Sequence, residues 1–400
     1  MICVGIDVSK EKSTVCIVKP YGELLCSPYE IKHTDSELSE LSKIILRMND
    51  EVKVVMEATG AYHIPVLNFL KEKGIFISVI NPLIMKKYAS MTLRKGKTDK
   101  IDSIKIANYG IDNWFRLEEY QLTEEVYEEL RLLGRQYSHY VKMKIESKLA
   151  LGNMLDKTMP GIKNLLKSGG ANPKKDKLND FVEEYWHFDN ISKKSEKQFI
   201  SSYLKWAKKM GYHQNETKAK HIHAIALESI PTLSSSSPST KMLVLESVRV
   251  LNEINQTLEL ILSQMRELSR ELKEYEVIKE MPGVGETLGP RLIAEIGDVR
   301  RFKNGKSLVA YAGIDAPPHE SGQFTGTKRH ISKRGSSLLR KTGYEVMKCL
   351  KSNKPLEDPV YKFMLKKELE GKAHKVAKIA ALNKFLRIYY ARVKEVYSSQ

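Results

Sequence analysis

Residues 1–29 read MICVGIDVSKEKSTVCIVKPYGELLCSPY and decide the fold class of the first part of the chain. Three β-type runs, residues 1–8, 13–18 and 23–29, are separated by a polar turn at 9–12 and by Pro20-Tyr21-Gly22. Short strands joined by tight turns predict an antiparallel meander. Asp7 ends the first run, and a carboxylate beside apolar neighbours that require burial needs a compensating partner.

Beyond the meander, helical and strand-like segments alternate up to about residue 115. The apolar spacing predicts helices over residues 35–48 and 64–73, strands over 52–58 and 76–80, and a further helix from about residue 98. Asn81-Pro82 ends the last strand. This alternation predicts an α/β domain over residues 1–115.

Carboxylates stand at the ends of these elements. Glu57 ends one strand, and Asp99 and Asp102 lie three residues apart at the start of a helix, so both face one side. Each has a structural explanation by itself, such as a helix-dipole contact for Asp99 or a lysine partner for Glu57. Together with Asp7, in an order compatible with a ribonuclease H-like fold, they predict a site for Mg²⁺ or Mn²⁺. Two such ions would stabilise the attacking and leaving oxygens of a phosphoryl transfer.

The net charge is unevenly distributed along the 400 residues, which carry a formal charge of +17. Residues 301–400 hold 22 basic and 8 acidic side chains, whereas residues 111–300 hold 28 of each. A basic segment on a nearly neutral chain predicts a nucleic-acid partner ahead of an acidic membrane. We expect no membrane association and a cytoplasmic protein, because apolar runs long enough to span a bilayer and a signal peptide are both missing. When bound to DNA, the protein is expected to be associated with the nucleoid. The four cysteines lack zinc-site spacing and are expected to be reduced.

The middle of the chain is predicted to be helical. Residues 251–275 carry apolar residues at alternating steps of three and four, which predicts a coiled-coil seam, and residues 123–155 could supply its partner within the chain or from another copy. We therefore expect a coiled-coil region over residues 116–277, with a polar insert at about 160–240 in which an aromatic cluster still packs.

A mostly helical basic domain is predicted over residues 278–400. Met281-Pro-Gly-Val-Gly285 precedes a helical stretch and is typical either of a helix-hairpin-helix element or of a plain tight turn. From Ser321 to Tyr344 the chain has six Lys or Arg and no acid, a composition suited to phosphate binding. The candidate nucleic-acid contacts are Lys97, Lys328, Arg329, Lys333, Arg334 and Arg340.

The N-terminal motifs resemble those of a known family. Val4-Gly-Ile-Asp7-Val-Ser-Lys10, Met56-Glu57-Ala-Thr-Gly60, Asn81-Pro82 and Lys97-Thr-Asp99-Lys-Ile-Asp102-Ser103 are similar to the successive blocks of the DEDD-type insertion-sequence transposases, the IS-one-ten family. The resemblance implies a RuvC-like N-terminal domain in which Asp7, Glu57, Asp99 and Asp102 bind Mg²⁺.

The C-terminal motifs extend the resemblance through Pro282-Gly-Val-Gly285, Tyr311-Ala-Gly313, Ser321-Gly322, Ile331-Ser-Lys-Arg-Gly335 and Leu339-Arg340. In the family, the serine before glycine is the nucleophile that forms a covalent phosphoserine link with DNA, a role that the resemblance gives to Ser321. Ser332, Ser336 and Ser337 compete for it, although Ser336 is expected to cap a helix. A serine hydroxyl needs activation, which the metal ions could provide if both domains met at one phosphate.

The resemblance also implies partners. These are donor and target DNA, a noncoding guide RNA that bridges them, and further copies of the chain in a dimer or tetramer.

Four other functions would explain parts of the pattern. A non-enzymatic nucleic-acid-binding scaffold is one of them, and the four carboxylates argue against it. A DNA invertase of the Piv/MooV type would share nearly all of these motifs, and a RuvC-like junction-resolving nuclease would hydrolyse DNA without Ser321. An actin-like sugar kinase would explain Gly5-Ile-Asp7, but a glycine-rich phosphate turn is missing and the basic C-terminal segment argues against it.

Overall fold

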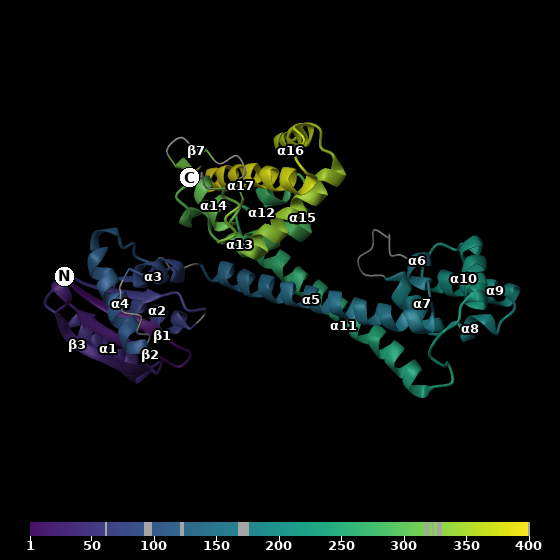
Figure 1. Ribbon diagram of the computed structural model, residues 1–400, viewed down its shortest axis with the longest axis horizontal. Helices are drawn as coiled ribbons and strands as arrows, with labels where there is room; N and C mark the ends of the chain where they lie inside the picture. Colours follow the sequence, from purple (N-terminus) through teal and green to yellow (C-terminus); the bar gives the residue numbers. More distant parts are fainter. Residues whose placement is uncertain are drawn as a thin grey trace. The chain divides into compact units, whose positions relative to one another are not determined.

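The computed structural model describes residues 1–60, 62–91, 98–120, 124–166, 176–316, 320–321, 324–325 and 330–398. The chain folds into two compact units, Met1–Leu122 and Thr123–Gln400 (Figure 1). The α/β-plus-α class predicted from the sequence is confirmed, because the described strands of the first unit form a mixed sheet and the second unit is mostly helical.

The first unit contains a five-stranded sheet in the order β3-β2-β1-β4-β5. The predicted meander is confirmed, since β1 (Ile2–Val8), β2 (Lys12–Val18) and β3 (Leu24–Lys32) pair antiparallel. Strand β4 (Val52–Glu57) then pairs parallel to β1, and β5 (Ile77–Ile80) pairs parallel to β4.

In the described part of the first unit, four α-helices connect or cover these strands, namely α1 (Asp35–Leu46), α2 (His63–Glu72), α3 (Pro82–Ala89) and α4 (Asp99–Asp112). Helix α3 was not predicted from the sequence. Asn81 caps it by accepting a hydrogen bond from Leu83 N at 2.8 Å, and Pro82 occupies the first turn, where its missing N–H costs nothing. The Asn-Pro pair therefore starts a helix as well as ending a strand.

The two faces of the sheet bury different helices. On β1, the even-numbered residues from Ile2 to Val8 pack in one core with α1 and α2. Cys3 packs in a second core on the opposite face, together with Val55 of β4 and Ala107 of α4. Successive strand residues alternate between faces, so Asp7 and Glu57 belong to the face that α4 covers.

The second unit is built on two long helices, α5 (Glu125–Thr158) and α11 (Pro238–Arg270), which pack along each other within the chain. Leu155 near the end of α5 and Val244 near the start of α11 share one core, whereas Leu130 and Met265 share another, so the helices are antiparallel. The coiled-coil seam predicted over residues 251–275 is wrong in extent, because α11 ends at Arg270. The later apolar residues of that pattern, Leu272 and Tyr275, join the C-terminal core instead. A coiled coil in the strict sense stays a prediction.

Each core belongs to a helical body at one end of this pair. The first body, which we call the insert body, is formed by the insert. It contains α6 (Ile162–Leu165), α7 (Lys177–Tyr185), α8 (Asp189–Ser192), α9 (Glu196–Lys209) and α10 (Glu216–Glu228). The C-terminal body contains α12 (Tyr275–Lys279), α13 (Gly285–Ile296), α14 (Gly305–Tyr311), α15 (Ser337–Asn353), α16 (Pro359–Leu369) and α17 (His374–Ser398). A short hairpin of β6 (Glu320–Ser321) and β7 (Phe324–Thr325) follows α14 in the chain. Within the described residues, helices long and apolar enough to cross a membrane are absent. The division into three domains stays a prediction.

Candidate active site

Asp7 and Glu57 lie at the same edge of the sheet. The parallel pairing of β1 and β4 runs as far as Ile6 opposite Met56, and each carboxylate is the next residue on its strand. Both side chains are half-buried and both belong to the face covered by α4. The strand register therefore brings two of the predicted acidic residues to neighbouring positions.

Helix α4 brings the other two to this edge. A Cβ on Gly5 would lie 2.7 Å from Ala107 Cβ and would overlap the backbone of Ser103, whereas a Cβ on Gly110 would overlap Cys3. Gly5 therefore lies beside Ser103 and Ala107, whereas Cys3 lies beside Gly110. Since residue numbers rise along the helix as they fall along the strand, α4 and β1 run in opposite directions. Asp7 lies two residues beyond Gly5, about 6.6 Å along the strand, which equals roughly four helical residues. The helix segment level with Asp7 is therefore its first turn, which contains Asp99 and Asp102.

Lysine side chains neutralise part of this acidic edge. Lys105 lies one turn after Asp102, and its ammonium is 3.1 Å from the Asp102 carboxylate. Lys12, at the start of β2, donates a hydrogen bond to Glu30 at 2.8 Å. That bond raises the pKa of Lys12 first of all, and Asp99 also contributes.

The four carboxylates suit a hard divalent cation in chemistry and in location, but they do not form a finished cage. Within the described residues, groups of three or more Asp, Glu, His or Cys side chains ready to hold a metal ion are absent. Since carboxylate oxygens are the preferred ligands of Mg²⁺, the donor set fits this ion. Binding would require the side chains to converge and Asp102 to exchange its Lys105 partner for the metal. The sequence analysis did not identify Lys105 as a partner of Asp102, although a spacing of three residues on a helix could have indicated the ion pair.

Ser321 lies on the β6–β7 hairpin, where it pairs with Phe324, while Glu320 pairs with Thr325. The segments before and after this hairpin are fastened to each other. Ser332 N donates to Asp315 O at 2.8 Å, Lys333 N donates to Gly313 O at 2.9 Å, and the Ser332 hydroxyl donates to the Asp315 carboxylate. The chain between Asp315 and Ser332 is thus a loop with its two ends held together.

Two glycines allow the flanking segments to come this close. A Cβ on Gly313 would lie 2.7 Å from Gly335 N, and a Cβ on Gly335 would overlap the carbonyl of Tyr311. Gly313 also has a φ of +64°, a value that favours glycine. The motifs Tyr311-Ala-Gly313 and Ile331-Ser-Lys-Arg-Gly335 therefore form the base of the loop that carries Ser321.

Two of the competing serines have structural partners. Ser332 holds Asp315, as described above. Ser336 accepts a hydrogen bond from Leu339 N at 3.0 Å as the N-cap of α15 and donates one to Glu295 at 2.8 Å, which confirms the predicted cap. Ser337 is exposed in the first turn of α15.

The candidate basic contacts differ in their surroundings. Lys97, Lys328 and Arg329 lie outside the described residues. Lys333 and Arg334 are exposed. The Arg340 guanidinium donates to Ala312 O at 3.0 Å and to Gly335 O at 3.1 Å, so it supports the base of the Ser321 loop. Its contact with nucleic acid stays a prediction, as do those of the other five.

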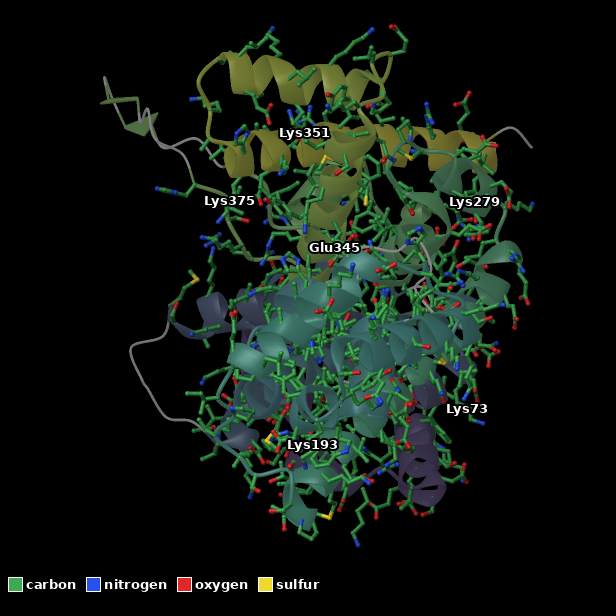
Figure 2. All side chains as sticks on the ribbon, turned by 90° about the vertical axis from the view of Figure 1, so that its right-hand side faces the viewer. Lys73, Lys193, Lys279, Glu345, Lys351 and Lys375 are labelled. Atoms are coloured by element: carbon green, nitrogen blue, oxygen red, sulfur yellow. The ribbon has the colours of Figure 1, made fainter. Side chains whose placement is uncertain are left out.

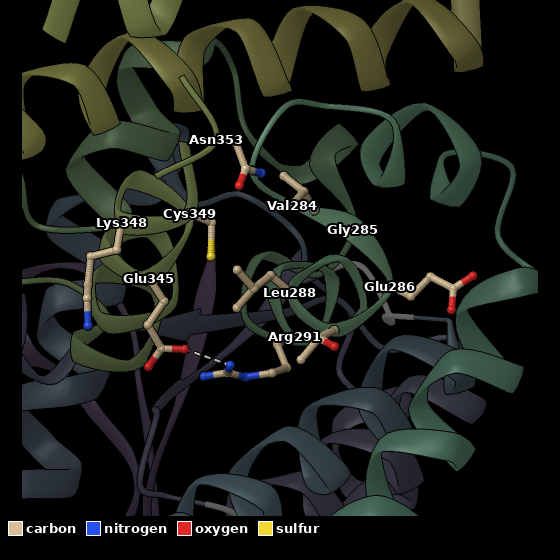
Figure 3. A pocket seen from close by; sticks show the side chains of 11 residues that line it. Val284, Gly285, Glu286, Leu288, Arg291, Glu345, Lys348, Cys349 and Asn353 are labelled. Carbon is tan, nitrogen blue, oxygen red and sulfur yellow. Dashed lines mark hydrogen bonds and ion pairs between the residues drawn. The ribbon is translucent and has the colours of Figure 1, made fainter. Parts of the chain in front are cut away.

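The Pro-Gly-Val-Gly turn joins α12 to α13 and lines a pocket of about 540 Å³ (Figure 3). Gly283 has a φ of +86°, and a Cβ there would lie 2.9 Å from Val346 O of α15. Arg291 and Glu345 form an ion pair of 2.7 Å in the same pocket, as Figure 3 shows. Packing against α15 therefore explains Gly283, and a phosphate contact at this turn stays a prediction.

Comparisons with known proteins find two transposase models and several related proteins. A transposase model of the DEDD type from IS110 elements matches residues 4–160, and the model described as "Transposase IS116/IS110/IS902 family" matches residues 275–362. The pilin gene-inverting protein of Moraxella lacunata is 21% identical over 392 residues, which cover 98% of this chain and 95% of that protein. An uncharacterised 44.8 kDa protein of insertion element IS116 from Streptomyces clavuligerus is 29% identical over 133 residues, covering 33% of this chain and 32% of that protein.

The similarity to a solved structure is weaker than the similarity to these sequences. Thermus thermophilus RuvC, solved in complex with a Holliday junction substrate, is 14% identical with a TM-score of 0.23. The match covers 29% of this chain and 96% of that chain.

Proposed function

The chain belongs to the IS116/IS110/IS902 family of transposases, which cut and rejoin DNA, and we propose that it does so through a carboxylate tetrad and a serine nucleophile. The tetrad is Asp7, Glu57, Asp99 and Asp102, on a domain that we propose to be RuvC-like, and the nucleophile is Ser321. The observation that carries the proposal is the antiparallel packing of α4 on β1, which sets the first turn of α4 level with Asp7.

In the proposed reaction, Ser321 Oγ attacks the phosphorus of a DNA phosphodiester. A bond forms between Oγ and phosphorus, the bond to the leaving DNA oxygen breaks, and the hydroxyl proton passes through water to that oxygen. In the rejoining step a DNA hydroxyl attacks the phosphoserine, and Ser321 recovers its proton. Mg²⁺ bound to the tetrad would supply Lewis-acid stabilisation of the attacking and leaving oxygens.

The base of the Ser321 loop supports its assignment as nucleophile. Asp315 and Ser332, which flank the β6–β7 hairpin in the chain, hold each other through backbone and side-chain hydrogen bonds. Ser332 and Ser336 already use their hydroxyl groups in structural hydrogen bonds. Exposed Lys333 and Arg334 lie next to the loop in the chain and would hold flanking phosphates.

The test is a search for a covalent adduct. The full chain is incubated with element-end DNA, the adjoining noncoding RNA and Mg²⁺, and the adduct is mapped by mass spectrometry. We expect phosphoserine at Ser321, loss of the adduct in Ser321→Ala with DNA binding retained, and normal adduct in the control Ser337→Ala. Adduct formation by Ser321→Ala would refute the nucleophile, and adduct formation by Asp7→Asn at the wild-type rate would refute the tetrad.

A second candidate function is site-specific DNA inversion, which the similarity to the pilin gene-inverting protein over 98% of this chain favours. Inversion uses the same cutting and rejoining chemistry on two sites in one molecule. A plasmid with two inverted sites would distinguish the functions, because an invertase reverses the intervening segment and a transposase moves the element. A junction-resolving nuclease would instead release hydrolysed DNA without an adduct.

Guidance by a noncoding RNA, and assembly into a dimer or tetramer, are further parts of the proposal. Their support is the family resemblance and the basic C-terminal hundred residues, which hold 22 basic and 8 acidic side chains. Omitting the RNA from the adduct assay tests the first part. Light scattering of the complex with DNA tests the second.

A further inference from the structure

A large groove lies beside the base of the Ser321 loop in the C-terminal body. Its volume is about 1000 Å³, at the upper end of the range for small-molecule sites. The groove is lined by α14, by Ala316 and His330 at the two ends of the loop, by Phe363 of α16 and by α17. The loop that carries Ser321 thus leaves from the groove and returns to it.

The floor of the groove is apolar. Val309 and Ile314 are buried beneath it, and Ile331, Ile379 and Phe363 are partly buried around them. An apolar floor of this size favours a ligand with a flat, weakly polar face over a fully hydrated ion. A nucleic-acid base has such a face once it has left its stack.

The rim of the groove is positively charged. Lys306, Lys375 and Arg387 are exposed lining residues, and they lack carboxylate partners within the described part of the chain. Figure 2 labels Lys375 on this body. The Lys384 ammonium lies 5.2 Å from the centre of the Phe363 ring, so it too is held at the groove.

Acidic side chains are few among the described residues that line the groove. Among the lining residues that the structure describes, Asp315 alone has a carboxyl group, and it accepts the Ser332 hydroxyl. Four cationic side chains beside one occupied carboxylate favour an anionic ligand. Phosphates on the rim and bases on the floor would satisfy the charge and the apolar surface together.

We propose that this groove binds unpaired nucleotides of the DNA strand next to the phosphate that Ser321 attacks. The proposal rests on the proposed function for the identity of that phosphate. It adds a binding site for single-stranded DNA, in which Lys306, Lys375, Lys384 and Arg387 contact phosphates and the Val309–Ile314 floor contacts bases. A continuous duplex does not fit the proposal, because its bases are stacked and cannot reach the floor.

The first test measures binding of the full chain to a labelled single-stranded DNA, without Mg²⁺ or RNA, at several salt concentrations. The variant Lys306→Gln/Lys375→Gln/Arg387→Gln removes three exposed charges, and each phosphate contact on a single strand contributes about 0.7 to the salt slope. We expect the slope to fall by about 2 and the affinity at 0.1 M salt to fall by about 100-fold. The control Lys193→Gln/Lys205→Gln/Lys208→Gln makes the same change in charge on the insert body and should keep the slope.

A second variant tests the charge of the groove without removing a cation. Val376 lines the groove and is 54% exposed, so Val376→Glu adds a carboxylate at little cost to folding. It should weaken single-strand binding, while Val376→Gln should not. Photocrosslinking of 4-thiothymidine placed beside the scissile phosphate should map to α17.

The outcomes separate this inference from the proposed function. Equal single-strand binding by the wild-type chain and the triple variant, with normal Ser321 adduct in both, overturns the groove and leaves the function standing. Tighter binding of the same sequence as RNA overturns the assignment to DNA. Strand binding in the groove without an adduct at Ser321 refutes the proposed function, and with it the position of the strand beside the scissile phosphate.

Discussion

Gly5→Ala should uncouple the two halves of the acidic tetrad. The new Cβ would lie 2.7 Å from Ala107 Cβ, whereas carbon atoms pack at about 3.5–4.0 Å, so α4 must move outward by about 1 Å. Such overpacking costs about 1–3 kcal/mol of stability. The same movement displaces Asp99 and Asp102 from Asp7. A misplacement of about 1 Å at a reacting centre costs on the order of 100-fold in rate.

The assay compares stability and chemistry in the same samples. Thermal unfolding gives the folded fraction, and formation of the covalent DNA adduct per folded molecule gives the rate. Gly110→Ala is the matched control, because its Cβ would overlap Cys3 at the far end of the same helix, about 12 Å from Asp102. It should destabilise the domain similarly and slow the reaction far less. Equal adduct rates in wild type and Gly5→Ala would refute the coupling.

Three further predictions concern other contacts. Lys105→Met removes the ammonium that lies 3.1 Å from Asp102, so Mg²⁺ should raise the melting temperature more in the variant than in wild type, and an equal rise would show that the lysine does not compete with metal. Gly335→Ala should abolish the adduct while single-strand binding to a folded protein, measured by fluorescence anisotropy, survives; full adduct formation would mean that the loop base is not needed. Burial, and then hydrogen bonding that includes the buried Glu274, raises the pKa of Tyr127. The folded state therefore favours the neutral phenol of Tyr127. Its contribution to the free energy of unfolding is complete below about pH 10 and is lost as the pH rises above that value. Circular dichroism should show a weaker loss of stability between pH 9 and 11 in Tyr127→Phe, and unchanged alkaline sensitivity would contradict this.

The strands of the sheet, and the strand ends at which Asp7 and Glu57 lie, could be predicted because local pattern determines them. Apolar alternation marks the strands, and an acidic residue that ends such a run is visible at once, as at Asp7 and Glu57. The close packing of α4 on β1 could not be predicted, because it depends on contacts that Gly5 and Gly110 make with residues far away in the chain.

Other features depend on contacts between distant parts of the chain. Helix α11 ends at Arg270 without a proline or glycine, close to Glu274, which is buried and accepts hydrogen bonds from Tyr127 at 2.7 Å and from Tyr397. These partners are more than 100 residues away, so a heptad pattern alone extends the helix too far. The Asp315–Ser332 contact likewise has no local signal.

The two parts of the proposed active site depend on the same physical device, a glycine beside a functional residue. Gly5 lies two residues before Asp7 and lets α4 approach the strand. Gly313 and Gly335 let the two ends of the Ser321 loop come close together. In both places a side chain would separate backbones that must touch, and the functional residue would move with them. A transposase motif of this kind is therefore a chemical group together with the glycine that positions it, and replacing the glycine should reduce DNA chemistry more than its cost in stability explains.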